Sequence, residues 1–97
     1  MLKYYVYFMT SKNGKALYVG VTNNLERRIM EHRTHDPKSF TSRYNCHKLI
    51  YYEEYSSNLE AIAREKQIKS WKRWRKEKLI DTMNPEHIDL MPIARLA

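Results

Sequence analysis

The segment Tyr4–Thr22 reads YYVYFMTSKNGKALYVGVT and carries the clearest structural signal in this chain. Aromatic and β-branched residues, which favour strands, lie on both sides of Asn13-Gly14. An Asn-Gly pair favours a two-residue type I′ turn, because that turn needs positive φ at both central residues. The pattern therefore predicts a β-hairpin with strands over about residues 3–9 and 16–22.

The predicted hairpin brings two tyrosines together. With a two-residue loop, Tyr7 lies opposite Gly20 and Met9 lies opposite Tyr18. Tyr7 and Tyr18 are then diagonal neighbours on one face, roughly 7 to 8 Å apart at the backbone. Gly20 leaves open space beside Tyr7. A loop longer than two residues would change this register.

A helix is predicted directly after the hairpin. Asn23 is its candidate N-cap, because Glu26 follows three residues later and apolar residues continue at helical spacing. We expect the helix to end near His35, before a proline. The polar residues 38–46 predict a surface loop, and residues 48–55, rich in Tyr, Leu and Ile, predict a third strand.

The second half of the chain predicts further helices. Ser57 and Glu60 form a capping-box pattern that opens a helix to about Lys69. Ser70 is a candidate cap for another helix over residues 71–83, and one continuous helix is the alternative.

Asn84-Pro85 ends the helical pattern. The resulting order is strand, strand, helix, strand, helix, helix. It predicts an α+β fold in which helices flank a small three-stranded antiparallel sheet. We expect residues 1–90 to form a single domain and residues 91–97 a short tail that packs on the body or frays.

Composition limits the classes of partner. The 97 residues include 18 Lys and Arg against 11 Asp and Glu, a formal charge of +7. This charge favours nucleic acid or an anionic membrane surface. The apolar stretches are short and the N-terminus has no apolar signal core, so we expect a soluble cytoplasmic protein without a membrane partner. The single cysteine, Cys46, suits a reducing compartment.

Two polar side chains share a face of the first predicted helix. Arg28 and His32 are four residues apart, and the apolar Leu25 and Ile29 lie on the same side. The guanidinium and the imidazole could therefore point at the sheet face that holds the two tyrosines. From this helix alone, the favoured interpretation is a surface arginine and a partly buried, satisfied histidine.

Glu65 lies close to the apolar side of the second predicted helix. A lone buried carboxylate is unfavourable unless it is paired or binds a metal. Lys69, four residues later, is an ion-pair partner, and from this helix alone the ion pair is the favoured interpretation. As a metal ligand, a single Glu completed by waters and substrate phosphates suits Mg²⁺.

Residues 66–78 hold seven Lys and Arg, interrupted by one acidic residue. Such charges neutralise phosphates. Trp71 and Trp74 are predicted to anchor the helix to the core, and the alternatives are stacking on a base or contact with a protein partner. The residues that we expect to contact nucleic acid are Lys69, Lys72, Arg73, Arg75 and Lys76.

With these elements in order, the chain resembles the GIY-YIG nuclease family, in particular its small single-domain bacterial branch. The likeness runs from Tyr4 to about Leu90. It comprises Tyr5-Val6-Tyr7, Tyr18-Val19-Gly20, Thr22, Leu25, Arg28, His32, the segment 63–69 and Asn84-Pro85. Tyr5 stands where the literal motif has Gly, and Val6 and Val19 replace Ile.

The resemblance implies an active site on one face of the sheet. It implies metal-dependent endonuclease hydrolysis of DNA, structure-selective and linked to repair or recombination. Many relatives attach this module to a separate DNA-binding domain, for which we expect no room here, so binding falls to the module itself or to a protein partner. The alternative is a non-catalytic nucleic-acid-binding module that retains the fold. The implied catalytic residues are Tyr7, Tyr18, Arg28, His32 and Asn84, with Glu65 as the ligand of Mg²⁺ or Mn²⁺.

Overall fold

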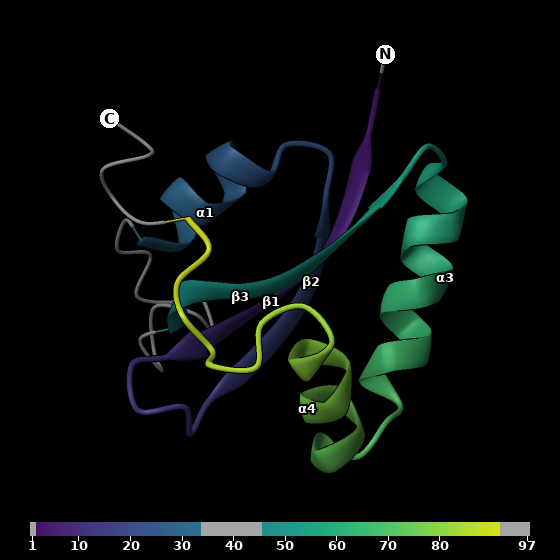
Figure 1. Cartoon of the computed structure of the whole chain (residues 1–97). Helices are drawn as coiled ribbons and strands as arrows, with labels where there is room; N and C mark the ends of the chain where they lie inside the picture. Colours follow the sequence, from purple (N-terminus) through teal and green to yellow (C-terminus); the bar gives the residue numbers. More distant parts are fainter. Residues whose placement is uncertain (1, 34–45, 92–97) are drawn as a thin grey trace.

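A computed structural model describes residues 2–33 and 46–91 of the chain. Three strands form one antiparallel sheet in the order β2-β1-β3. The predicted α+β class and the predicted order of elements are both confirmed (Figure 1). The elements are β1 Tyr4–Ser11, β2 Leu17–Thr22, α1 Leu25–Arg33, β3 Cys46–Tyr55, α3 Asn58–Lys69 and α4 Arg73–Asp81.

The central strand β1 has a core layer on each of its faces. Successive side chains of a strand point to opposite faces, so even and odd positions separate. Val6 and Phe8 pack with apolar residues of α3 and α4, whereas Tyr7 and Met9 pack with Ile29 of α1. In Figure 1, α1 lies on one side of the sheet and α3 on the other. Both faces of β1 are therefore covered.

The hairpin has the predicted register but a different turn. Residues 12–15 form the loop, and the Gly14 amide donates to the carbonyl of Ser11 at 2.9 Å. Gly14 has a positive φ of 76°, while Asn13 is not among the described residues with positive φ. The type I′ prediction is therefore wrong. The register survives because a longer loop centred on the same peptide bond gives the same pairing.

The cap of α1 lies one residue later than predicted. Asn24 Oδ1 accepts a hydrogen bond from the backbone of Arg27 at 3.0 Å, which makes Asn24 the capping residue instead of Asn23. The side-chain oxygen of Thr22 accepts from the Asn24 amide at 3.2 Å. This contact holds the end of β2 and delays the start of the helix.

Of the two caps predicted for the later helices, the one at Ser57 is confirmed and the one at Ser70 is wrong. Ser57 caps α3 as predicted, and its side chain accepts from the Glu60 amide at 3.4 Å. Ser70 is the C-cap of α3, whereas α4 begins after Lys72, so Ser70 does not open the next helix. The two predicted helices are confirmed, and the alternative of one continuous helix is wrong. The predicted helix end near His35 and residues 38–45 of the predicted loop lie outside the described residues. The last residue of that loop prediction, Cys46, is buried and begins β3, so the prediction is wrong there.

A bulge in β3 explains one buried polar side chain. The pairing register shifts after Phe8, so Ile50 is left out of the ladder with β1. Asn84 Nδ2 donates to the carbonyl of Ile50 at 3.0 Å and to that of Ile88 at 2.8 Å. Asn84 Oδ1 accepts from the Ile88 amide at 3.1 Å. The side chain thus satisfies a carbonyl exposed by the bulge.

The chain beyond α4 packs on the body as far as it is described. Leu90 N donates to the carbonyl of Leu49 at 2.7 Å. Arg33 donates to Asp89 Oδ2 at 2.9 Å and to the carbonyl of Met91 at 2.7 Å. Met91 is buried, so the packed region extends one residue into the predicted tail. None of the helices in the described parts of the chain has the length and apolar character needed to cross a bilayer.

Candidate active site

Two tyrosines meet over a glycine of the edge strand β2. Tyr7 on β1 is fully buried and pairs with Gly20 on β2. The rings of Tyr7 and Tyr18 lie with their centroids 6.1 Å apart. A Cβ atom on Gly20 would lie 2.6 Å from Tyr7 Oη and 2.8 Å from Tyr18 Cε2. The predicted shared face is confirmed, and the glycine is what allows both rings to occupy it.

Helix α1 brings a guanidinium and an imidazole to the same face. Tyr7 Oη lies 2.7 Å from His32 Nε2, and Arg28 Nε donates to Tyr7 Oη at 3.3 Å. The His32 ring is buried, with its centroid 5.7 Å from that of Tyr7 and 5.2 Å from that of Tyr18. Arg28 and His32 therefore both point at the tyrosines, as their shared helix face allowed, and the favoured interpretation of Arg28 as a plain surface residue is wrong.

The environment keeps the buried members of this cluster uncharged. Burial, and then the neighbouring Tyr18, raise the pKa of Tyr7 well above its usual range, although Arg28 opposes the shift. Burial and then the charge of Arg28 lower the pKa of His32 to about 4. The hydrogen bond to Tyr7 raises the pKa of Arg28 further. At neutral pH the cluster holds a neutral phenol, a neutral imidazole and a charged guanidinium.

This charge state allows one chain of hydrogen bonds through the Tyr7 oxygen. Arg28 donates to that oxygen, and in the His32 tautomer whose Nε2 is unprotonated the Tyr7 hydroxyl donates to Nε2. A neutral imidazole is a proton acceptor within reach of a phenol. The arrangement therefore places the Arg28 guanidinium, which could bind a phosphate, next to the Tyr7–His32 pair, which could transfer a proton.

The Arg28 side chain connects the buried cluster to solvent. It is 41% exposed and forms an ion pair with Glu31 at 3.1 Å. Glu31 was not predicted from the sequence, although its spacing three residues after Arg28 is a signal for such a pair. An incoming phosphate would compete with this carboxylate for the guanidinium.

Glu65 lies on α3 and forms the ion pair predicted for it. Its Oε2 lies 3.4 Å from Lys69 Nζ, and its side chain is 16% exposed. Helix α3 covers the sheet face opposite Tyr7. Its neighbour on the helix, Arg64, bonds Glu53 of β3. Glu65 is thus not part of the hydrogen-bonded cluster around Tyr7.

Asn84 also lies apart from that cluster. All the hydrogen bonds described for its side chain join it to backbone groups of Ile50 and Ile88. Its place is under the bulge of β3, where it orders the chain that follows α4. The sequence could not indicate this partner, because the bulge has no local signal.

The predicted nucleic-acid-binding residues have mixed surroundings. Lys69 pairs with Glu65. Arg73 donates to the carbonyls of Gly14 and Lys15, the latter at 2.6 Å, and so ties α4 to the hairpin tip. Arg75 lies over the Trp71 ring, 4.1 Å from its centroid. Lys72 is exposed and Lys76 is half-buried.

The two tryptophans differ in exposure. Trp71 packs against the core layer of α3 and α4, as predicted. Trp74 is 58% exposed, with Lys78 Nζ 5.6 Å from its ring centroid, so its prediction as a core anchor is wrong. The break between α3 and α4 rotates the second helix and turns this indole to solvent.

A tyrosine pair on a three-stranded antiparallel sheet, faced by an arginine and a histidine from the following helix, defines a class of catalytic domain. The family description of the GIY-YIG catalytic domain matches residues 3–78 of this chain. The chain therefore belongs to the GIY-YIG family, a family of nucleases.

Its relatives include small proteins of similar length. It is 38% identical over 81 residues to UPF0213 protein SH2523 of Staphylococcus haemolyticus, covering 84% of this chain and 98% of that protein. It is 35% identical to a UPF0213 protein of Limosilactobacillus reuteri, covering 96% and 95% of the two chains. The solution structure of UPF0213 protein BH0048 from Bacillus halodurans is 23% identical, with a TM-score of 0.57 over 95% of this chain and 97% of that one. That likeness shows the same fold.

Proposed function

We propose that this protein is a divalent-metal-dependent endonuclease that hydrolyses phosphodiester bonds of DNA, with structure-selective cleavage in repair or recombination. The observation that carries the proposal is the hydrogen-bonded set of Arg28, Tyr7 and His32 with Tyr18 packed on it. Binding alone needs no buried phenol joined to a neutral imidazole. The free buried thiol of Cys46 suits a reducing compartment, so we place the activity in the cytoplasm.

Each of these side chains has a task in phosphodiester hydrolysis. Arg28 neutralises charge on the attacked phosphate, because its guanidinium is charged and partly open to solvent. Tyr18 is half-buried on the edge strand and meets the attacking water more readily than the fully buried Tyr7. Tyr7 accepts a hydrogen bond from Arg28 and so holds the guanidinium in place. The same hydroxyl is hydrogen-bonded to His32. This assignment makes Tyr18 the tyrosine nearer to the water.

Glu65 is the proposed metal ligand. In the described residues there is no group of three or more His, Cys, Asp or Glu side chains that could hold a metal ion. One carboxylate suits Mg²⁺, which keeps several waters and takes further oxygens from phosphate. Glu65 comes from the helix on the sheet face opposite Arg28, so a metal held there and Arg28 could act on one phosphate only around an edge of the sheet. Mg²⁺ or Mn²⁺ would then supply Lewis-acid stabilisation of the phosphate oxygens and the leaving group. Lys69 would have to release its contact with Glu65.

The test is cleavage of single-stranded, duplex, flapped and branched DNA with Mg²⁺ or Mn²⁺, with and without chelator. Arg28→Ala should lower the rate by about 100-fold or more, as for loss of one donor to a developing oxyanion. Arg27→Ala is the matched control, because Arg27 is an exposed neighbour that pairs with the same Glu31. It removes the same charge and should leave the rate nearly unchanged.

Three outcomes count against parts of the proposal. Equal losses of cleavage rate in the Arg27 and Arg28 variants would show that Arg28 acts only by general electrostatic attraction. Full activity of Glu65→Ala would refute the metal assignment. Intact binding without cleavage of any substrate would favour the non-catalytic nucleic-acid-binding module.

A further inference from the structure

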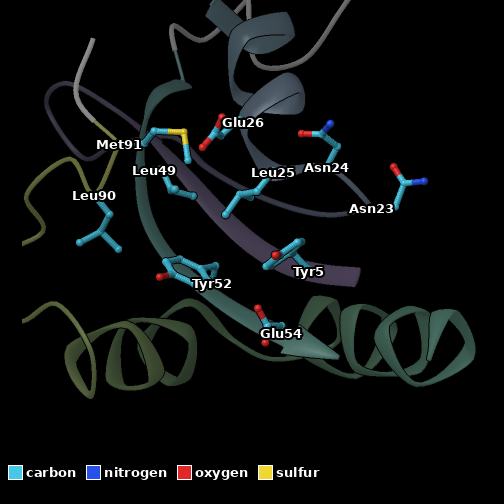
Figure 2. A pocket seen from close by; sticks show the side chains of 10 residues that line it. All are labelled: Tyr5, Asn23, Asn24, Leu25, Glu26, Leu49, Tyr52, Glu54, Leu90 and Met91. Carbon is cyan, nitrogen blue, oxygen red and sulfur yellow. The ribbon is translucent and has the colours of Figure 1, made fainter. Parts of the chain in front are cut away.

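A pocket of about 380 Å³ lies on the α1 face of the sheet. Tyr5 of β1 and Tyr52 of β3 form one wall, with their ring centroids 6.3 Å apart and their planes at 67°. Figure 2 shows Leu25 and Leu49 near these rings, with Glu26 and Glu54 on opposite sides. Asn23, Asn24, Leu90 and Met91 complete the lining. We name it the Tyr5–Tyr52 pocket.

The charge of this pocket is opposite to that of the protein. Its charged lining residues are Glu26 and Glu54, and no Lys or Arg is among the described residues that line it. Glu54 lies 3.4 Å from Lys3, with both side chains about half exposed. Two carboxylates repel a phosphate group, so the pocket does not fit the backbone of a nucleic acid. They accept hydrogen bonds from a flat group that carries N–H donors.

The pocket adjoins the proposed cleavage site. Tyr5 and Tyr7 lie two residues apart on one face of β1, about 7 Å along the strand. Leu25 and Arg28 lie one turn apart on α1. A nucleotide whose phosphate meets Arg28 therefore has the pocket within reach of its own base or that of a neighbour.

From this geometry we propose that the Tyr5–Tyr52 pocket binds one unpaired base of the DNA substrate, stacked against tyrosine and hydrogen-bonded at its edge to Glu26, since Glu54 pairs with Lys3. This inference rests on the proposed nuclease function and adds what the site recognises. A basic peptide fits the pocket's carboxylates as well. It is disfavoured because the whole protein carries a charge of +7, which attracts nucleic acid and repels a cationic partner.

The carboxylates also give the pocket a base preference. Cytosine, adenine and guanine carry exocyclic amino groups that donate to a carboxylate, whereas the one Watson–Crick-edge donor of thymine, N3–H, lies between two carbonyl oxygens that repel a carboxylate. An unpaired cytosine should therefore bind better than an unpaired thymine. Tyr5 stands where the family motif has Gly, so this wall belongs to the chain's own sequence and not to the shared motif.

The experiment measures binding by fluorescence anisotropy in chelator, so that cleavage plays no part. The probes are labelled duplexes that are fully paired, or carry one bulged cytosine or one bulged thymine. The wild-type protein should bind the cytosine bulge about tenfold tighter than the paired duplex, from base–aromatic stacking. It should prefer cytosine over thymine by about fivefold, from the carboxylate contact.

Two variants locate these preferences in the pocket. Tyr52→Leu should reduce the advantage of both bulges, and Glu26→Gln should remove the preference for cytosine over thymine. Glu60→Gln is the control, because Glu60 is also an exposed acid in the first turn of a helix but lies on α3. Removing an acidic charge tightens DNA binding generally, so only the ratio between probes is diagnostic.

A wild-type protein that binds all three duplexes equally would overturn the inference, as would bulge preferences that survive both pocket variants. If instead an arginine-containing peptide binds and Glu26→Gln weakens it, while the duplexes bind equally, the pocket is a peptide site. Absence of cleavage with these preferences intact would refute the nuclease function and leave the base site standing. Cleavage of DNA without the bulge preferences would refute the base site and leave the nuclease function standing.

Discussion

Replacing Gly20 by alanine places a methyl group where the two site tyrosines meet. The new Cβ would lie 2.6 Å from Tyr7 Oη, 2.7 Å from Tyr7 Cζ and 2.8 Å from Tyr18 Cε2. These distances are well inside carbon contact, which is optimal at about 3.5 to 4.0 Å. Tyr7 is fully buried and bonded to Arg28 and His32, so its ring has little room to give way.

The expected loss of stability follows from two opposing effects. Overpacking of a filled core typically destabilises by about 1 to 3 kcal/mol. Alanine regains about 0.5 to 1 kcal/mol over glycine in a strand, because the unfolded chain loses freedom. We expect Gly20→Ala to lower the free energy of unfolding by about 1 to 2 kcal/mol. In a domain of this size that is a fall in Tm of roughly 5 to 15 °C.

The assay is urea and thermal unfolding followed by far-ultraviolet circular dichroism, with near-ultraviolet spectra to report the tyrosine environment. Gly14→Ala is the matched control, because nothing lies within 4 Å of its added Cβ but its φ is +76°. It should cost about 1 kcal/mol through backbone strain alone and leave the tyrosine spectrum unchanged. A Gly20→Ala protein with wild-type stability and tyrosine spectrum would refute the packing argument.

Two further predictions concern single buried groups. The pKa of His32 is about 4 in the folded protein and about 6.5 in the unfolded chain. Between these two pH values His32 is protonated in the unfolded chain but not in the folded protein. Stability should fall by about 3 kcal/mol as pH drops from 6.5 to 4 and should be unaffected by this group above pH 6.5. Chemical denaturation across that range should show the slope in wild type, and an equal slope in His32→Gln would contradict it. Asn84→Ala should destabilise by about 1 to 3 kcal/mol in urea unfolding because it leaves the Ile50 carbonyl buried and unpaired; wild-type stability of this variant would show that water replaces the amide.

Local sequence was sufficient for the hairpin and for half of the site. The hairpin pattern predicted the pairing of Tyr7 with Gly20, because alternation and loop position together set the register. Helical spacing predicted that Arg28 and His32 share a face. Side chains three or four residues apart meet on a helix whatever the rest of the fold does.

Other features depended on contacts between distant parts of the chain. The exposure of Trp74 follows from a break at Ser70, where spacing alone was compatible with one continuous helix. The partner of Asn84 is a carbonyl that only the bulge in β3 frees. The helix cap moved by one residue to Asn24 and the hairpin loop lengthened to residues 12–15, because competing local hydrogen bonds differ little in free energy.

The sequence by itself determined that Tyr7 and Tyr18 occupy one face of a hairpin, because periodicity and register are local properties of the backbone. The tertiary structure decided that this face is closed by α1, and that burial there keeps Tyr7 and His32 neutral. It also decided that Glu65 lies on a helix covering the other face of the sheet. Burial and proximity between distant segments arise only when the layers pack, so no local pattern encodes them.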